Sequence, residues 1–579
     1  MRNQLQQDRI MRILLFAFGL SLAAQELQLT QAWIYDTKDS KEPAKGGGRA
    51  PALEVTPVYE KGRIYIATPW GTVAALDASN GKEIWRISLK VNPKGSYGDF
   101  VNRGVSLRGE RLYTGTVDGR LVCREKSSGA ACANFGKGGE VDLTQGLRRP
   151  PQWVGEYAVT SAPAIFEDLV ITGSAIADNS RANMASGEVR AFDANTGALR
   201  WTFHPLPEGL AAGGANTWSR VVADESTGLV FLPTGSASPD YFGGLRPGPN
   251  NHANSLVALH GRTGKLAWSF QTVHHDLWDY DVASPPTLYE FGGRKAVAVG
   301  SKTGHLFLLD RLTGRPLYPV EERAVPQSKA RGELTSQTQP FPSKPGPLVK
   351  QRISEADLWG PTPEDKKACG ELFRTLRNDG IFTPPSEQGS LIVPGNIGGM
   401  HWGGAAWAPQ SGMLVIPLND IPAIIRLIPQ LSFNSARAQH PDRETTEQKG
   451  TDFAMSREFF RSPSGMPCIE PPWGWLAGVS VQTGEIAWKV KFGELINLGG
   501  AAISKNGIVF LGADISPYLR AFDSKSGKQI GQWPLPTSAR ATPAIYTHED
   551  QEYVIIAAGG HDAPMSKLDT KIVAFRIGE

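Results

Sequence analysis

Short apolar runs interrupted by polar turns recur along the chain from about residue 50 onward. The unit is a strand-like run, a polar turn containing Thr-Gly or Ser-Gly, and a second run ending in an aromatic residue, as in AALDASNGKEIW and AFDANTGALRW. This pattern predicts a β-hairpin whose turn requires positive φ, a conformation that glycine adopts without steric cost. The predicted turn glycines are Gly81, Gly129, Gly197, Gly264, Gly314, Gly484 and Gly527.

The spacing of these glycines predicts a propeller. Most steps are about 45 to 70 residues, the size of a four-stranded blade with variable loops. The gap from Gly314 to Gly484 exceeds one blade, and the stretch WGGAAWAPQSGMLVIPLND inside it is interpreted as an eighth copy without the turn signature. We therefore predict an all-β, eight-bladed β-propeller over residues 25–579, with seven blades as the alternative. Pairing of the N-terminal QAWIYDT with the C-terminal KIVAFRI would complete one blade.

Two polar segments interrupt the repeat. Residues 320–395 and 432–472 are rich in Pro, Ser and charged residues, which predicts insertions on the loop face of the propeller. Between them, residues 421–431 are unusually apolar for a loop. This stretch is either a packed segment or an exposed patch for membrane docking, and the second interpretation would assign Ile424 and Leu427 to peripheral membrane contact.

The N-terminus predicts export. Three arginines precede the apolar run ILLFAFGLSLAA, which ends in small residues suited to cleavage, so residues 1–24 are a predicted signal peptide. The run is too short for a comfortable membrane span, and an uncleaved interfacial anchor is the alternative. We expect a periplasmic protein, soluble or peripherally attached to a membrane.

Charge and cysteine content narrow the function classes. The formal net charge is +3 and no basic block occurs, so nucleic-acid binding has no support. Four cysteines in an exported chain suit two disulfides. Cys123 and Cys132 flank a turn-like segment, and their pairing would leave Cys369 for Cys468, one of three connectivities. No CxxCH motif is present, which excludes a covalently attached c-type haem.

The chemistry lies outside the repeat. The segment QTVHHDLWDYDVASPP gathers Asp276, Asp279 and Asp281, and strand alternation would place the last two on one side. Such a pair suits a shared hard cation, or a base whose pKa the neighbour tunes. Lys302, in SKTGHLFLLD, ends a predicted buried strand and needs an anionic partner. The alternative is a set of ion pairs on the propeller rim.

Taken together, these stretches resemble the pyrroloquinoline quinone (PQQ)-dependent alcohol and glucose dehydrogenases, most closely the glucose dehydrogenase branch. The matching motifs include VNRGVSL, LPTGSASPDYFGG, HHDLWDYD, SKTGHLFLLDRLTGRPL and AAGGHDAP, in family order, whereas TG-x-x-W hairpins occur in all PQQ-repeat propellers. The resemblance implies PQQ-dependent oxidation of a sugar or polyol, with ubiquinone or a soluble cytochrome c as electron acceptor. Alternatives are quinate or a simple alcohol as substrate, and a non-catalytic scaffold propeller.

The resemblance also implies residue roles. Asp279 matches the catalytic base, and Lys302 matches the cation beside the quinone carbonyls of the cofactor. The other implied cofactor contacts are Glu54, Arg103, Thr160 and Trp218, the last of which matches a stacking tryptophan. The implied ligands of a Ca²⁺ ion, with Mg²⁺ or a lanthanide as alternatives, are Asp178, Ser236, Asp279 and Asp281. Ser236 stands where the alcohol dehydrogenases have an asparagine, so water or Asp281 is expected to complete the coordination.

Overall fold

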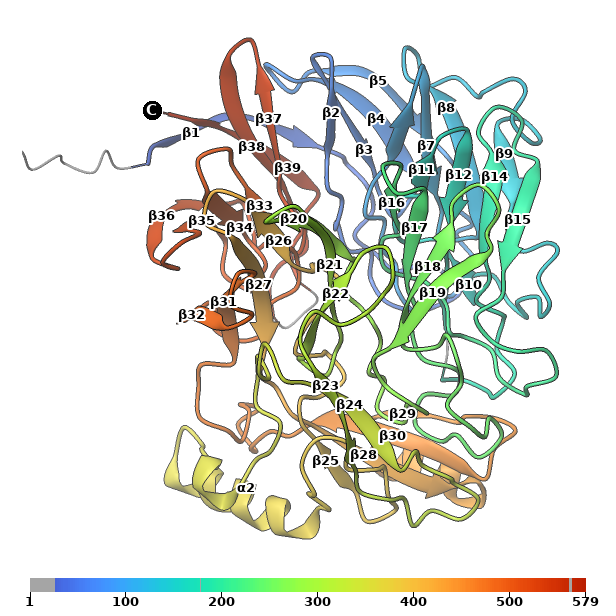
Figure 1. The fold of residues 1–579 in the computed structure, drawn as a ribbon, viewed down its shortest axis with the longest axis vertical. Coiled ribbons are helices and arrows are strands. Elements are labelled where there is room, and N and C mark those ends of the chain that lie inside the picture. Colours follow the sequence, from blue (N-terminus) through green and yellow to red (C-terminus); the bar gives the residue numbers. More distant parts are fainter. Residues whose placement is uncertain (1–26, 178, 562–564, 579) are drawn as a thin grey trace, which may run out of the picture.

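The structure is a computed structural model that describes residues 27–177, 179–561 and 565–578. Within these residues, eight antiparallel sheets follow one another around the molecule as the blades of a propeller, from blue through green to red in Figure 1. The first strands of neighbouring blades contact one another, which places them innermost around the axis. The predicted eight-bladed architecture is therefore confirmed.

The first four blades each contain four strands in meander order. The first blade contains β2 (Val58–Glu60), β3 (Arg63–Ala67), β4 (Thr72–Asp77) and β5 (Glu83–Ser88), and the second contains β6 (Ser106–Arg108), β7 (Arg111–Gly115), β8 (Arg120–Glu125) and β9 (Glu140–Asp142). The third contains β11 (Ala164–Phe166), β12 (Leu169–Thr172), β14 (Val189–Asp193) and β15 (Leu199–Phe203). The fourth contains β16 (Val222–Asp224), β17 (Leu229–Pro233), β18 (Ser255–His260) and β19 (Leu266–Gln271). A short ribbon of β10 (Tyr157–Ala158) and β13 (Ala175–Ile176) lies between them in sequence.

The fifth blade has three strands, and the remaining three blades have four. The fifth blade contains β20 (Thr287–Phe291), β21 (Arg294–Gly300) and β22 (Leu306–Asp310), and the sixth contains β26 (Ala406–Ala408), β27 (Met413–Asn419), β31 (Gly474–Ser480) and β32 (Ile486–Lys491). The seventh contains β33 (Ala502–Ile503), β34 (Ile508–Leu511), β35 (Tyr518–Asp523) and β36 (Gln529–Pro534). The eighth contains β37 (Ala544–His548), β38 (Gln551–Ala558) and β39 (Lys571–Ile577) together with β1 (Leu29–Asp36). The pairing of β1 with β39 joins the two ends of the chain, as predicted.

The turn glycines explain the repeat. All seven predicted positions have φ between 67° and 75°, the left-handed region. In five cases a tryptophan of the preceding blade packs on the glycine so closely that a Cβ would overlap the indole, and its Nε1 donates to a carbonyl of that turn over 2.9 to 3.2 Å. The pairs are Trp33 with Gly81, Trp85 with Gly129, Trp201 with Gly264, Trp268 with Gly314 and Trp488 with Gly527. At these five places the motif therefore joins one blade to the next.

The predicted position of the eighth copy was wrong. Residues 402–420 contribute β26 and β27, which pair with β31 and β32 and so belong to the blade of Gly484. The eighth blade is the one closed by β1, which lacks a turn glycine of its own. A long segment is inserted between β27 and β31, the second and third strands of the blade of Gly484. The first two strands of this blade therefore lie far from the last two in the sequence.

A separate lobe lies beside the propeller, at the bottom of Figure 1. It contains a four-stranded sheet in the order β25 (Ser390–Ile392), β28 (Ala423–Pro429), β30 (Phe453–Phe459) and β29 (Glu444–Thr446). Its other elements are β23 (Val320–Ala324), β24 (Thr338–Pro342), η1 (Glu355–Asp357), α2 (Pro363–Thr375), η2 (Gln430–Ser432) and α3 (Phe433–Gln439). We call residues 320–395 and 421–472 the insertion lobe. It includes both segments that were predicted as insertions.

The docking hypothesis for residues 421–431 is not supported. The central strand β28 runs between β25 and β30, and Ile424 and Leu427 are 0% and 3% exposed. The packed-segment interpretation is correct, because pairing on both edges buries the strand in the core of the lobe. Only its end is exposed, at Pro429 and Leu431. Among the described residues, no helix has the length and apolar character needed to span a membrane.

Both disulfides follow the predicted connectivity. Cys123 bonds Cys132, and Cys369 of α2 bonds Cys468 after β30, across 99 residues of chain. The first staples a hairpin of the second blade, and the second ties together two parts of the insertion lobe. The predicted signal peptide, residues 1–24, lies outside the described residues.

Candidate active site

A cavity of about 240 Å³ lies where the propeller meets the insertion lobe. Loops of several blades line it, and Arg457 of β30 reaches it from the lobe. It brings together Glu54, Arg103, Trp218, Asp279, Asp281 and Lys302, six of the residues singled out from the sequence. We call this the cofactor cavity, after the role that the resemblance assigns to those residues.

The centre of the cavity is an ammonium group shared by two carboxylates. Lys302 Nζ lies 2.5 Å from Asp279 Oδ1 and 2.8 Å from Asp281 Oδ2. The two aspartates do face the same group, but not through strand alternation, because they occupy the loop between β19 and β20. Asp279 has φ 62°, a left-handed conformation that non-glycine residues rarely adopt and that is enriched at functional sites.

Burial and charge oppose each other in this cluster. Burial penalises the ammonium, but the charges of Asp279 and Asp281 outweigh it and raise the pKa of Lys302. Burial likewise penalises the Asp281 carboxylate, yet Lys302 and the hydrogen bonds from Ser236 lower its pKa. For Asp276, burial dominates and raises the pKa. Asp281 is therefore held ionised, whereas Asp276 acts in the loop as an acceptor for the backbone N–H groups of Trp278 and Tyr280.

An aromatic wall lies beside the charged cluster. The Trp218 indole donates through Nε1 to Asp281 Oδ2 over 3.2 Å. Its ring centroid is 5.8 Å from Lys302 Nζ and 5.6 Å from the Arg103 guanidinium, which also lies 4.6 Å from the Trp402 ring. Fixed by this bond and by flanking cations, Trp218 offers a rigid platform on which a flat ring can stack.

Arg103 is held in place by two partners. Its Nη2 pairs with Glu54 Oε2 at 2.9 Å, and its Nη1 donates to Thr160 Oγ1 at 3.1 Å. The second oxygen of Glu54 pairs with Arg540 at 2.9 Å. Thr160 thus supports Arg103 rather than lining the cavity itself. Glu54 is buried and pairs with two guanidinium groups that both line the cavity, which leaves this trio with a net positive charge.

Cations outnumber carboxylates on the described walls. The cations are Arg49, Arg103, Lys302, Arg457 and Arg540, and the carboxylates are Glu54, Asp99, Asp279 and Asp281. His401 also lines the cavity; burial and the neighbouring arginines lower its pKa to about 3, and its buried Nε2 has no partner among the described residues. A flat ligand with several carboxylates and ring carbonyls fits this donor set, and PQQ is such a molecule.

The implied metal ligands are only partly together. Ser236 donates to Asp281 Oδ1 from both its N (2.7 Å) and its Oγ (3.0 Å), and Oγ also lies 2.5 Å from Asp276 Oδ2. Asp178 lies outside the described residues. In the part of the chain that the structure describes, no group of three or more His, Cys, Asp and Glu side chains is arranged to hold a metal ion.

Sequence reasoning missed the contribution of the insertion lobe. Arg457 Nη1 lies 2.9 Å from the Tyr241 hydroxyl and 3.4 Å from Asp279 Oδ2, while its other nitrogens pair with Glu444 at 2.7 and 2.8 Å. The available signal was the pair of charged residues, Arg457 and Glu458, inside the otherwise apolar strand-like run FAMSREFF. Trp402 and Arg540 were also missed; each precedes the first strand of a blade, as Arg103 does.

Comparisons with known proteins agree with this geometry. Residues 26–554 match the family described as "PQQ: Glucose/ethanol/alcohol dehydrogenase, beta-propeller domain". The chain is 33% identical to a quinoprotein glucose dehydrogenase of Escherichia coli (95% of this chain, 75% of that one). It is 32% identical to a quinate/shikimate dehydrogenase (quinone) of Acinetobacter baylyi (92% and 73%). A quinohemoprotein alcohol dehydrogenase structure from Comamonas testosteroni shares the fold, with a TM-score of 0.69 and 23% identity over 95% of this chain and 76% of that one.

Proposed function

Since the chain belongs to the PQQ-dependent dehydrogenases and is therefore a quinoprotein dehydrogenase of alcohol or sugar substrates, we propose that it oxidises a hydroxyl of a sugar or polyol and passes the electrons to a quinone. The observation that carries the proposal is the meeting of Asp279, Lys302 and Trp218 in one cavity. A scaffold propeller would have no need for a buried ammonium between two carboxylates.

Bound PQQ supplies an ortho-quinone that accepts a hydride equivalent from the substrate carbon. Asp279 removes the proton of the substrate hydroxyl, because Asp281, the other carboxylate beside Lys302, is also held by hydrogen bonds from Ser236 and Trp218. Lys302 supplies a positive charge where negative charge develops during the reaction. Trp218 stacks on the cofactor, and Arg103 and Arg540 bind its polar edge.

We also propose a Ca²⁺ ion, with Mg²⁺ or a lanthanide as alternatives. Ser236 donates to Asp281, and Lys302 occupies the space between the two aspartates, so the described residues do not by themselves fit a metal. The proposed ion would therefore depend on Asp279 and Asp178. We assign no catalytic step to it.

The mouth of the cofactor cavity favours a hydroxyl-rich substrate. An adjoining cavity of about 310 Å³ is lined by Arg49, Asp99, Glu444 and Arg457, which offer both donors and acceptors to hydroxyl groups. Quinate is the second candidate. Identity to glucose and quinate dehydrogenases is nearly equal, at 33% and 32%, and the exposed Arg49 would suit a carboxylate.

We further propose that the protein is exported to the periplasm. Both disulfides are of the kind that persists in an oxidising compartment, and no cysteine is left free. Fractionation of cells that express the full chain checks this. Recovery in the reducing cytoplasm with free thiols would contradict the proposal.

Reconstitution tests the function. The purified protein is loaded with PQQ and Ca²⁺, Mg²⁺ or La³⁺, and turnover is followed with a dye acceptor on glucose, other aldoses, glycerol, quinate and ethanol. We expect PQQ binding and the highest kcat/KM on a sugar or polyol. Absence of PQQ binding with every metal would refute the cofactor assignment, and turnover of ethanol alone would refute the substrate class. Short-chain ubiquinone and a soluble cytochrome c then compete as acceptors.

A further inference from the structure

One charged residue interrupts a ring of small or uncharged residues around the propeller axis. The residue two places before the first strand of each blade occupies an equivalent position around the axis. These residues are Thr56, Gly104, Ala162, Arg220, Pro285, Gly404, Gly500 and Thr542. The repeat itself does not require an arginine, because seven blades are built without one. Arg220 therefore needs a separate explanation.

Arg220 faces a second, larger cavity on the axis. This axial cavity has a volume of about 830 Å³ and is lined by the first strands of the blades and the segments before them. Its volume is within the range of small-molecule sites. Most of the wall is apolar, from residues that include Val58, Val105, Ile165, Val221 and Leu288.

The polar groups of the axial cavity come from several blades, and they differ in whether they already have protein partners. The hydroxyls of Ser161 and Thr287 already donate to backbone carbonyls, each over 2.7 Å. By contrast, Ser219 Oγ is buried without a protein partner, and the neighbouring Arg220 forms no ion pair with any described residue. Arg220 is exposed to the cavity, but the protein around the cavity lowers its pKa by desolvation. Ser219 and Arg220 are thus two adjacent donors without an acceptor among the described residues, on a wall that is mostly apolar but also carries Tyr59, Glu60 and Arg103.

The axial cavity adjoins the cofactor cavity. Arg103 and Trp402 line both, so one guanidinium and one indole separate the two spaces. Their contact is close, with the Arg103 guanidinium 4.6 Å from the Trp402 ring. A ligand in the axial cavity would therefore lie across a wall of two side chains from a cofactor stacked on Trp218.

We infer that the axial cavity binds the quinone that accepts the electrons, with Arg220 and Ser219 at its carbonyl oxygen. This inference rests on the proposed function and adds the acceptor site to it. A quinone has a flat apolar ring, which suits the walls, and carbonyl oxygens that gain negative charge on reduction, which suits a cation. Substrate and acceptor then reach the cofactor from opposite sides of the wall.

Each substrate molecule leaves two electrons and two protons with the cofactor and the water around it. The quinone takes up two electrons across the wall and two protons from the water of the axial cavity, and becomes a hydroquinone. The cofactor returns to its oxidised form and releases two protons on its own side. No further oxidant is needed.

Direct binding tests the site without turnover. Short-chain ubiquinone is titrated against the protein, with and without PQQ, and bound quinone is measured by equilibrium dialysis. Arg220→Gln should weaken binding by about 10- to 100-fold, the effect of losing a charge-assisted hydrogen bond. The control is Arg262→Gln, because this arginine is 73% exposed and paired with Glu167 outside the cavity. Its quinone affinity should match that of the wild type.

A second variant separates binding from misfolding. Ala162→Trp adds an indole to the axial cavity without changing charge, and should abolish quinone binding while the PQQ absorbance spectrum stays unchanged. Wild-type quinone affinity in both variants would place the site elsewhere and overturn the inference. So would equal displacement of the quinone by inorganic phosphate, which would make Arg220 a simple anion site. If the wild type shows no PQQ-dependent dye reduction but Arg220→Gln still weakens quinone binding, the proposed function fails and the axial site stands.

Discussion

Arg457 Nη1 lies 3.4 Å from Asp279 Oδ2, although 178 residues separate the two in the chain. Arg457 belongs to the insertion lobe, and Asp279 to a loop of the propeller. Glu444 binds the rest of the guanidinium, which fixes its orientation. The lobe therefore supplies part of the active site, in addition to covering one side of the propeller.

Replacing this arginine should impair the reaction without unfolding the protein. Arg457→Gln is expected to lower kcat/KM by about 10-fold or more, because the variant loses a charge-assisted bond beside Asp279, the carboxylate proposed as the base. Steady-state kinetics with a dye acceptor measure the effect. Arg443→Gln is the matched control, since Arg443 pairs with Glu458 in the same lobe away from Asp279. Equal losses in both variants would mean that only the stability of the lobe matters.

Asp279→Asn should nearly abolish turnover while PQQ still binds. The amide cannot accept the substrate proton, and loss of a general base costs about 10²- to 10⁴-fold in rate. The kcat with a dye acceptor, together with the PQQ absorbance spectrum and thermal unfolding, measures the change. A variant that retains more than a few per cent of the wild-type kcat would show that another group takes the proton.

Lys302→Ala should also lower kcat strongly, by about 10²-fold or more. The substitution removes the charge that stabilises the developing anion and leaves two neighbouring carboxylates without their shared ammonium. Lys295→Ala, in the strand β21 that precedes Lys302, serves as the control and should keep wild-type kinetics, because Lys295 contacts Ser226 and not the two aspartates. Single-turnover reduction of bound PQQ by substrate distinguishes a slower chemical step from weaker substrate binding.

Trp218→Ala should act mainly on cofactor affinity. Loss of the stacking platform is expected to raise the Kd for PQQ by about 10- to 100-fold, because stacking stabilises the ground state as well as the transition state. Trp218→Phe keeps a ring and should recover much of the affinity. Titration of the apoprotein with PQQ, followed by fluorescence, checks both variants. Wild-type affinity in Trp218→Ala would remove this residue from the cofactor site.

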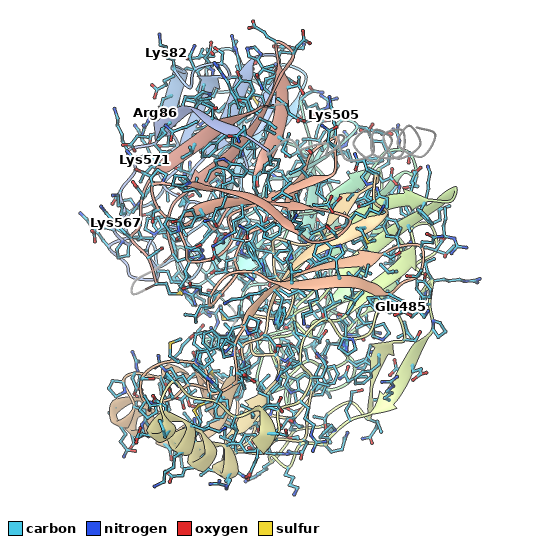
Figure 2. All side chains as sticks on the ribbon, turned by 90° about the vertical axis from the view of Figure 1, so that its left-hand side faces the viewer. Lys82, Arg86, Glu485, Lys505, Lys567 and Lys571 are labelled. Carbon is cyan, nitrogen blue, oxygen red and sulfur yellow. A yellow bond between two sulfur atoms is a disulfide. The ribbon has the colours of Figure 1, made fainter. Side chains whose placement is uncertain are left out.

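The closing blade should contribute a stability that depends on pH. Although partial burial acts the other way, bonds from Lys571 and Thr570 lower the pKa of Asp36 from 3.8 to about 2. Because the folded-state pKa is depressed, this stabilisation is complete above the unfolded pKa of about 4 and is lost as pH falls toward 2. Lys571 lies on the outer surface (Figure 2), so solvent screens the pair and Asp36→Asn should cost only about 0.5 to 1 kcal/mol.

Urea unfolding at pH 6 and at pH 2.5 measures this effect. The difference in the free energy of unfolding between wild type and Asp36→Asn should be present at pH 6 and shrink at pH 2.5. The control is Asp442→Asn, which changes an exposed carboxylate of the insertion lobe outside the β1–β39 pairing. A difference that is the same at both pH values would exclude the titration of Asp36 as its cause.

Much of the fold could be predicted because its signals are local. A turn glycine and the strands around it lie within about a dozen residues, and the requirement for positive φ at Gly81 or Gly264 acts within a single turn. The cysteine pairing and the closure of the ring by β1 and β39 were predicted for similar reasons, since few partners were available. Asp279 and Lys302 stood out because ionisable groups in apolar surroundings require partners.

The tertiary structure decided the contacts between segments that are far apart in the sequence. In five cases a tryptophan of one blade packs on the turn glycine of the next, so the motif that local sequence assigned to one hairpin also holds two blades together. The apolar run around Ile424 became a buried strand only because β25 and β30 pair with it from far along the chain. The contact of Arg457 with Asp279, and the lack of an ion pair at Arg220 among the described residues, also depend on how segments far apart in the sequence pack together. Chain closure over such separations leaves no trace in local periodicity, so only the packed fold brings these charges to their partners or leaves them without one.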